Sequence, residues 1–98
     1  MKYELKQNGG ELTVTVEGRL DTASAPELEK ALEPVLKDTD HIIFDFSNLD
    51  YVSSAGLRVI SYAHMNMRMG GTTKAIHCNS VVKQVLEVTG FTGFMTVE

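Results

Sequence analysis

The sequence predicts an α/β domain in which a small mixed β-sheet of four to five strands is flanked by three or more α-helices. Segments with the two-residue period of strands alternate with segments that have the three-to-four-residue spacing of helices, a pattern typical of parallel strand pairs. A turn signal at residues 8–10 favours an antiparallel hairpin at the start, which makes the sheet mixed. With 98 residues and 43% hydrophobic residues, we expect residues 1–98 to form a single domain.

The first two predicted strands are residues 3–6 and 11–18. In the second, Leu12, Val14 and Val16 face one side of the sheet, because side chains alternate along a strand. This segment is the most regular strand pattern in the chain.

A first helix is predicted from about Ser24. Ser24 and Glu27 have the spacing of a capping box, and Thr22 is a rival cap. Pro34 lacks the backbone N–H that a helix interior needs, so we expect a kink or an early end there.

The second strand–helix unit begins with a strand at residues 41–46, followed by a loop. Leu57, Ile60, His64 and Met67 then recur at helical spacing, which predicts a helix from Ser54 to about Met69. Gly70-Gly71 is expected to end it, since glycine adopts the left-handed conformation without strain. A second apolar stripe on this helix indicates packing between sheet and neighbouring helix, or alternatively a methionine-bearing contact surface: Val59, Tyr62, Met65, Met69.

The remaining segments complete the alternation. Residues 72–78 form another predicted strand, and Asn79 or Ser80 is expected to cap a third helix. Gly90 suits the position after that helix, and residues 94–97 are a short final strand or a docked tail.

Charge and composition narrow the class of partner. Nine basic and thirteen acidic residues give a net charge of −4, which argues against nucleic acid or an anionic membrane as the main partner. The single cysteine, Cys78, fits a reducing compartment. No apolar run approaches the ~20 residues of a membrane span, so we expect a cytoplasmic protein.

Two adjacent serines mark the change from loop to helix. Ser53 has the position of a helix N-cap, and Ser54 lies in or beside the first turn. A helix start exposes unpaired N–H groups and the positive end of the helix dipole, so an anion on Ser54 would be favoured there. The simpler interpretation is that both serines only cap the helix.

Enzyme chemistry finds little support in the motifs. A nucleophile elbow needs Gly-x-Ser-x-Gly, and Val52 occupies the first glycine position although Gly56 occupies the last. The three histidines and Cys78 show no metal-ligand spacing, and no phosphate-binding or dinucleotide-binding glycine motif occurs. We therefore expect no cofactor, and a small serine hydrolase remains only a remote alternative.

The segment Phe44–Ile60 closely resembles the core of STAS domains, the family of bacterial anti-sigma factor antagonists. Gly18-Arg19-Leu20-Asp21 and Val88-Thr89-Gly90-Phe91 resemble the same family, in the same order. The resemblance implies that Ser54 matches the serine that a partner kinase phosphorylates. Many members have Asp at the position of Ser53. Because this chain has a serine there instead, Ser53 is the second candidate for phosphorylation. The implied partner-binding residues are Asp21, Thr22, Ser24, Ser53, Ser54, Gly56, Leu57 and Arg58.

The resemblance also implies a regulatory role. The unphosphorylated chain would bind an anti-sigma serine kinase and so release a sigma factor. The kinase would then phosphorylate Ser54, and a phosphatase would reverse the modification. An alternative within the same resemblance is a structural subunit of a membrane lipid-transport ATPase.

Two aspartates have competing interpretations. The resemblance places Asp21 in a partner-facing loop, whereas its local chemistry also suits a cap for Ala23 or Ser24. Asp45, in the strand before the serines, is interpreted as a buried acceptor that fixes the loop.

Overall fold

The computed structural model describes all residues, 1–98, and its elements follow the predicted alternation. The strands are β1 (Lys2–Asn8), β2 (Glu11–Leu20), β3 (His41–Asp45), β4 (Leu49–Val52), β5 (Thr72–Ile76) and β6 (Met95–Val97). The helices are α1 (Ala25–Leu36), α2 (Ser54–Asn66) and α3 (Ser80–Val88), with a short 3₁₀ turn η1 (Phe91–Gly93) before β6.

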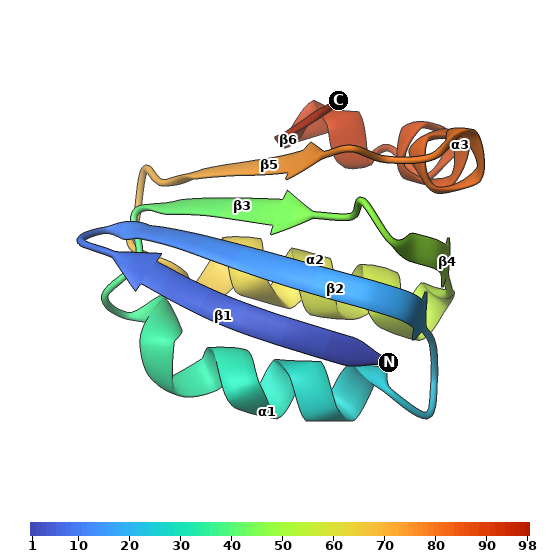
Figure 1. The fold of residues 1–98 in the computed structure, drawn as a ribbon. Coiled ribbons are helices and arrows are strands. Elements are labelled where there is room, and N and C mark those ends of the chain that lie inside the picture. The colour runs from blue at the N-terminus through green and yellow to red at the C-terminus, as the bar shows by residue number, and fades with distance from the viewer.

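The sheet is mixed, as predicted. Its strand order is β1-β2-β3-β5-β6; β1 and β2 pair antiparallel as the hairpin, and the other pairs are parallel. Figure 1 shows β1 and β6 at the two edges, with the chain ends beside them.

A sixth strand, β4, lies in the segment that the sequence predicted as a loop, and this prediction is wrong. The first half of β2 pairs with β3, whereas residues 18–20 pair with β4, with a register shift between Gly18, where φ is +86°, and Arg19. Glycine permits this conformation at low cost. The burial of Leu49 and Val52 stabilises β4, which carries the chain directly to α2.

One face of the sheet carries the core. Leu12, Val14 and Val16 of β2 are buried, as the alternation predicted, beneath α1 and α2. Figure 1 shows these two helices side by side on the same face, while α3 lies beyond the end of β5. The opposite face is partly exposed and mostly polar. None of the helices combines the length and the apolar content that a membrane span requires.

Two predicted helix ends differ from the structure. Helix α1 does not stop at Pro34 but continues to Leu36; Pro34 is exposed, so water can satisfy the carbonyl that lacks a donor. Helix α2 ends at Asn66 rather than near Met69, because Met67 becomes extended and the Arg68 N–H donates to the Thr39 carbonyl at 3.0 Å. Gly70 is left-handed, with φ +84°, but lies in the following turn.

Helix α3 is capped by Asn79, one of the two residues predicted for this role. The Asn79 side chain accepts a hydrogen bond from the Val82 N–H at 2.8 Å and donates to the Leu49 carbonyl at 2.9 Å. The cap therefore also ties α3 to β4. Gly90, with φ +83°, ends the segment in the predicted left-handed conformation.

Candidate functional site

The two serines at the start of α2 have different environments. Ser53 is half-buried and extended, with φ −92° and ψ 177°, and its Oγ accepts a hydrogen bond from the Gly56 N–H at 3.3 Å. Ser54 is the first residue of the helix; it is exposed, and its hydroxyl makes no hydrogen bond within the chain. Ser53 thus caps the helix, and Ser54 presents a free hydroxyl at its positive end.

Gly56 lets the first turn of α2 approach β2 and β4 closely. A Cβ built at this position would lie 2.7 Å from the Leu20 carbonyl oxygen and 2.8 Å from a Val52 methyl carbon. Gly56 is buried beneath the surface that carries Ser54, rather than exposed on it. Its role is to seat the helix and so to fix the direction of the Ser54 side chain.

The loop after β2 lies beside this helix start. Leu20 pairs with Val52 in the β2–β4 ladder, and the Ser53 N–H donates to the Leu20 carbonyl at 2.9 Å. The loop that begins at Asp21 therefore meets the Ser53–Ser54 segment at one sheet end. The carboxyl ends of the parallel strands β2 and β4 bring the two together, and β4 is the strand that the sequence did not predict.

Asp21 organises its own loop. Its Oδ1 accepts hydrogen bonds from the N–H groups of Ala23 and Ser24, both at 3.1 Å. The bond from the Ser24 backbone is the main cause that holds the pKa of the Asp21 carboxyl below its ordinary value. The local capping interpretation of Asp21 is therefore correct, and it leaves the other carboxylate oxygen near Arg19, 3.7 Å from Nε.

The predicted capping box at Ser24 and Glu27 is wrong. Ser24 holds the N-cap position of α1, but its side chain makes no cap hydrogen bond to the helix. The Ser24 hydroxyl instead accepts from the Asp21 N–H at 2.9 Å and lies 2.8 Å from the Arg19 carbonyl oxygen. These partners lie three and five residues before Ser24 in the chain, in the loop and at the end of β2 rather than in the helix. Thr22, the rival cap, is exposed.

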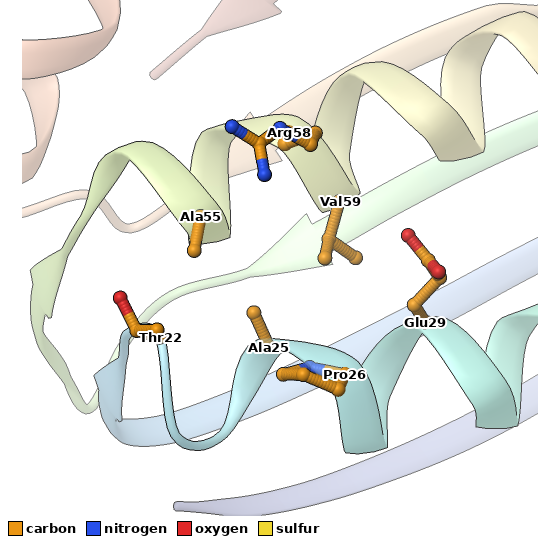
Figure 2. A pocket seen from close by; sticks show the side chains of 7 residues that line it. All are labelled: Thr22, Ala25, Pro26, Glu29, Ala55, Arg58 and Val59. Carbon is orange, nitrogen blue, oxygen red and sulfur yellow. The ribbon is translucent and has the colours of Figure 1, made fainter.

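A groove opens between the first turns of α1 and α2. Its volume is about 300 Å³. Figure 2 shows Ala55 and Val59 of α2 facing Ala25 and Pro26 of α1 across it, with Thr22 at one end. The groove is lined by Thr22, Ala25, Pro26, Glu29, Ala55, Arg58 and Val59.

The lining of the groove includes some of the predicted site residues and others that were not predicted. Thr22 and Arg58 are part of its lining, and Ala55 follows Ser54 directly. Leu57 is half-buried. Sequence reasoning missed the α1 residues Ala25, Pro26 and Glu29, because only the packing of α1 against α2 creates the groove.

Arg19 adds a further feature that sequence reasoning missed. Its guanidinium carbon lies 4.4 Å from the centre of the Tyr51 ring, within range of a cation–π interaction. Arg19 and Tyr51 are paired positions of β2 and β4, so the contact braces the strand end on which the serines stand. No local sequence signal could show this pairing.

The histidines are engaged away from the serines. His41 Nδ1 lies 2.7 Å from Thr72 Oγ1, and His64 Nδ1 lies 2.6 Å from Thr73 Oγ1. His77 contacts Asp45 and Ser47, both at 3.2 Å. The imidazoles are thus bonded to side chains of the sheet and its loops, and none is hydrogen-bonded to Ser53 or Ser54.

Asp45 fixes the loop after β3, as interpreted, although it is half-buried rather than buried. Its Oδ1 accepts from the Ser47 N–H at 3.1 Å and from the Ser47 hydroxyl. The hydroxyl bond is the main cause that lowers the pKa of Asp45, and the contact with His77 adds to it.

The residues of the second apolar stripe of α2 differ in their exposure to solvent. Val59 is buried and Tyr62 is half-buried, as the packing interpretation predicts. Met65 and Met69 are instead exposed, at 76% and 103% of the reference area, so packing does not explain them. Met69 lies outside the helix because α2 ends at Asn66.

Comparisons with known proteins agree with this architecture. The family model of the STAS domain matches residues 2–98. The chain is 31% identical over 99 residues to a putative anti-sigma factor antagonist, BtrV, of Bordetella bronchiseptica, covering 99% of this chain and 85% of that protein. It is 25% identical over 91 residues to the anti-sigma-B factor antagonist of Bacillus subtilis, covering 92% of this chain and 84% of that protein.

Solved structures show the same fold. The anti-sigma factor antagonist SpoIIAA in its unphosphorylated form superposes with a TM-score of 0.87 at 16% identity, covering 99% of this chain and 88% of that one. SpoIIAA of Bacillus in its phosphorylated form gives a TM-score of 0.79 at 15% identity, covering 99% of this chain and 91% of that one.

Proposed function

This chain belongs to the STAS domain family, and we propose that it is an anti-sigma factor antagonist controlled by phosphorylation of Ser54. The names of the two relatives at 31% and 25% identity support the antagonist role. In this proposal the unmodified chain binds an anti-sigma serine kinase, and the kinase ends the interaction by phosphorylating the chain. A phosphatase restores binding. The chain is then a substrate and a binding module rather than a catalyst.

The observation that carries the proposal is the difference between the two serines. Ser53 Oγ is committed to the Gly56 N–H, whereas the Ser54 hydroxyl is exposed and free of intramolecular bonds. A kinase needs an accessible hydroxyl whose modification does not break a hydrogen bond that the fold uses. This favours Ser54 over Ser53 as the acceptor.

A phosphate on Ser54 would act on the partner rather than on the fold. It adds about −1.5 to −2 charges at pH 7, next to a helix N-terminus that favours anions. The first turn of α2 contains no acidic residue that would repel it. Phosphorylation is therefore expected to leave α2 intact and to block docking by charge and bulk.

We assign the docking surface to the residues around Ser54. The loop residues Asp21, Thr22 and Ser24 would contribute one side, and Ser54, Leu57 and Arg58 of α2 the other. Ser53 and Gly56 would hold the helix start in place beneath it. The groove between α1 and α2 offers this surface an apolar depression for a side chain of the kinase.

The test compares three variants for capture of partners from a lysate of the source organism. Ser54→Ala is expected to retain an anti-sigma kinase and to gain no phosphate when ATP is added. Ser54→Asp is expected to lose the kinase, and Ser53→Ala, the matched control, is expected to be phosphorylated at Ser54. Equal retention by Ser54→Ala and Ser54→Asp, measured by quantitative mass spectrometry, contradicts the proposal.

A further inference from the structure

We propose that, once Ser54 is phosphorylated, the Arg58 guanidinium of the same chain binds the phosphate group. This inference rests on the proposed function and gives Arg58 a regulatory role at that site. In the unmodified protein Arg58 would remain available to the partner; after phosphorylation its guanidinium would turn to the phosphate.

The helix places the two residues on one side, a single turn apart. Ser54 is the first residue of α2, and Arg58 lies four positions further along. Residues with this spacing have Cβ atoms about 5–6 Å apart, within reach of a phosphoserine and an arginine. The order also suits the helix dipole, because the anion comes first and the cation follows.

The Arg58 side chain already extends in the required direction. Figure 2 shows its guanidinium reaching back along α2 toward the end that carries Ala55. Long side chains on helices usually point toward the N-terminus in this way. No change of backbone is needed to bring the guanidinium to a phosphate on Ser54.

Arg58 is also the arginine without a partner. Arg19 stacks on Tyr51 and lies 3.7 Å from Asp21, and Arg68 Nε donates to the Lys37 carbonyl at 3.1 Å. Arg58 is exposed, and it forms no ion pair and no hydrogen bond. A guanidinium is planar and can bind two phosphate oxygens at once, so an unused one beside a phosphoacceptor favours capture.

No carboxylate of the neighbouring elements forms an ion pair with Arg58. Glu29 of α1 lines the same groove but forms no ion pair with Arg58. Asp21 of the neighbouring loop is engaged by its own backbone donors and by Arg19. Asp50 of β4 is exposed and forms no ion pair. The Arg58 guanidinium is therefore available to a phosphate on Ser54.

Capture would change the surface in two ways. The phosphate adds negative charge, and the guanidinium at the groove leaves the position from which it could bind a carboxylate of the partner. One modification would then remove an attractive group and install a repulsive one. The captured phosphate would also be less accessible to a phosphatase.

The test uses the full chain with phosphoserine encoded at position 54, so that no kinase is required. Phosphorus NMR follows the phosphate resonance as pH is varied. In Arg58→Ala, the pKa of the phosphate is expected to rise by about 0.3 relative to the parent, because the cation no longer favours the dianion. Arg58→Lys is expected to restore part of the difference. Arg68→Ala, beyond the C-terminal end of α2, is the control for general charge and is expected to leave the pKa unchanged.

The outcomes separate this inference from the proposed function. An unchanged phosphate pKa in Arg58→Ala, with the folded state verified by circular dichroism, overturns the capture by Arg58. That result leaves kinase binding untouched, since binding is measured on the unmodified chain. Conversely, equal capture of a kinase by the Ser54 variants would overturn the proposed function while the phosphate titration could still show the contact with Arg58.

Discussion

Ser53 Oγ accepts a hydrogen bond from the Gly56 N–H at 3.3 Å, and the adjacent hydroxyl of Ser54 forms none. One serine therefore stabilises the start of α2, and the other can change its chemistry without loosening it. The fold therefore places a capping serine directly before the exposed serine for which we propose the modification.

Replacing Ser53 should weaken the fold more than replacing Ser54. Ser53→Ala removes the cap of α2, and the loss of such a cap costs about 1 kcal/mol. Ser54→Ala removes an exposed hydroxyl and is expected to change the free energy of unfolding by less than about 0.5 kcal/mol. Urea denaturation of both variants measures the difference. Equal losses of stability in the two variants would contradict the assignment of the α2 cap to Ser53.

Gly56→Ala should destabilise the protein although alanine favours helices. The new methyl group would lie 2.7 Å from the Leu20 carbonyl oxygen, so α2 must move away from β2. Overpacking of this kind costs about 1–3 kcal/mol. Thermal unfolding measures the loss, with Gly93→Ala as the control because a Cβ there meets no atom within 4 Å. A Gly56→Ala variant as stable as the parent would contradict the close approach.

Acid should destabilise the loop after β3 through Asp45. The Ser47 hydroxyl, and then the other contacts, lower the pKa of Asp45 in the folded state. The folded state therefore binds the proton less readily than the unfolded chain. The stabilisation is present above the ordinary pKa of about 3.9 and is lost as pH falls below it.

The variant Asp45→Asn tests this expectation. Its free energy of unfolding should decline less steeply with falling pH below about pH 4, because one carboxylate no longer titrates. Asp38→Asn is the control, since the exposed Asp38 side chain forms no hydrogen bond or ion pair. Urea denaturation at several pH values gives the slopes. Identical slopes for the parent and Asp45→Asn would contradict the role of Asp45.

Cys78 should react slowly with thiol reagents in the folded protein. Burial raises the pKa of its thiol, and Lys83 offsets this only in part. The thiolate, which is the reactive form, is then scarcer than in an exposed cysteine. We expect labelling by a disulfide reagent at pH 8 to accelerate several-fold when the chain is unfolded in urea. A folded rate equal to the unfolded rate would show that the thiol is not shielded.

Local pattern was sufficient wherever neighbouring residues decide the structure. The alternation of Leu12, Val14 and Val16 predicted β2 and its buried face, and Asn79 was one of the two caps expected for α3. Ser53 was also correctly placed at a helix start, because capping depends on residues only three positions away.

Contacts between distant segments decided what the pattern could not. β4 exists because Leu20 pairs with Val52, and α2 ends early because Arg68 bonds to Thr39. The same kind of contact brought Ala25 opposite Ala55 to form the groove. The sequence by itself determined the order of the strands and helices other than β4, and the position of the two serines, because period and capping are local properties. Only the tertiary structure decided what lies beside the two serines, namely the loop that begins at Asp21 and the groove between α1 and α2, since these depend on packing between elements that are far apart in the chain.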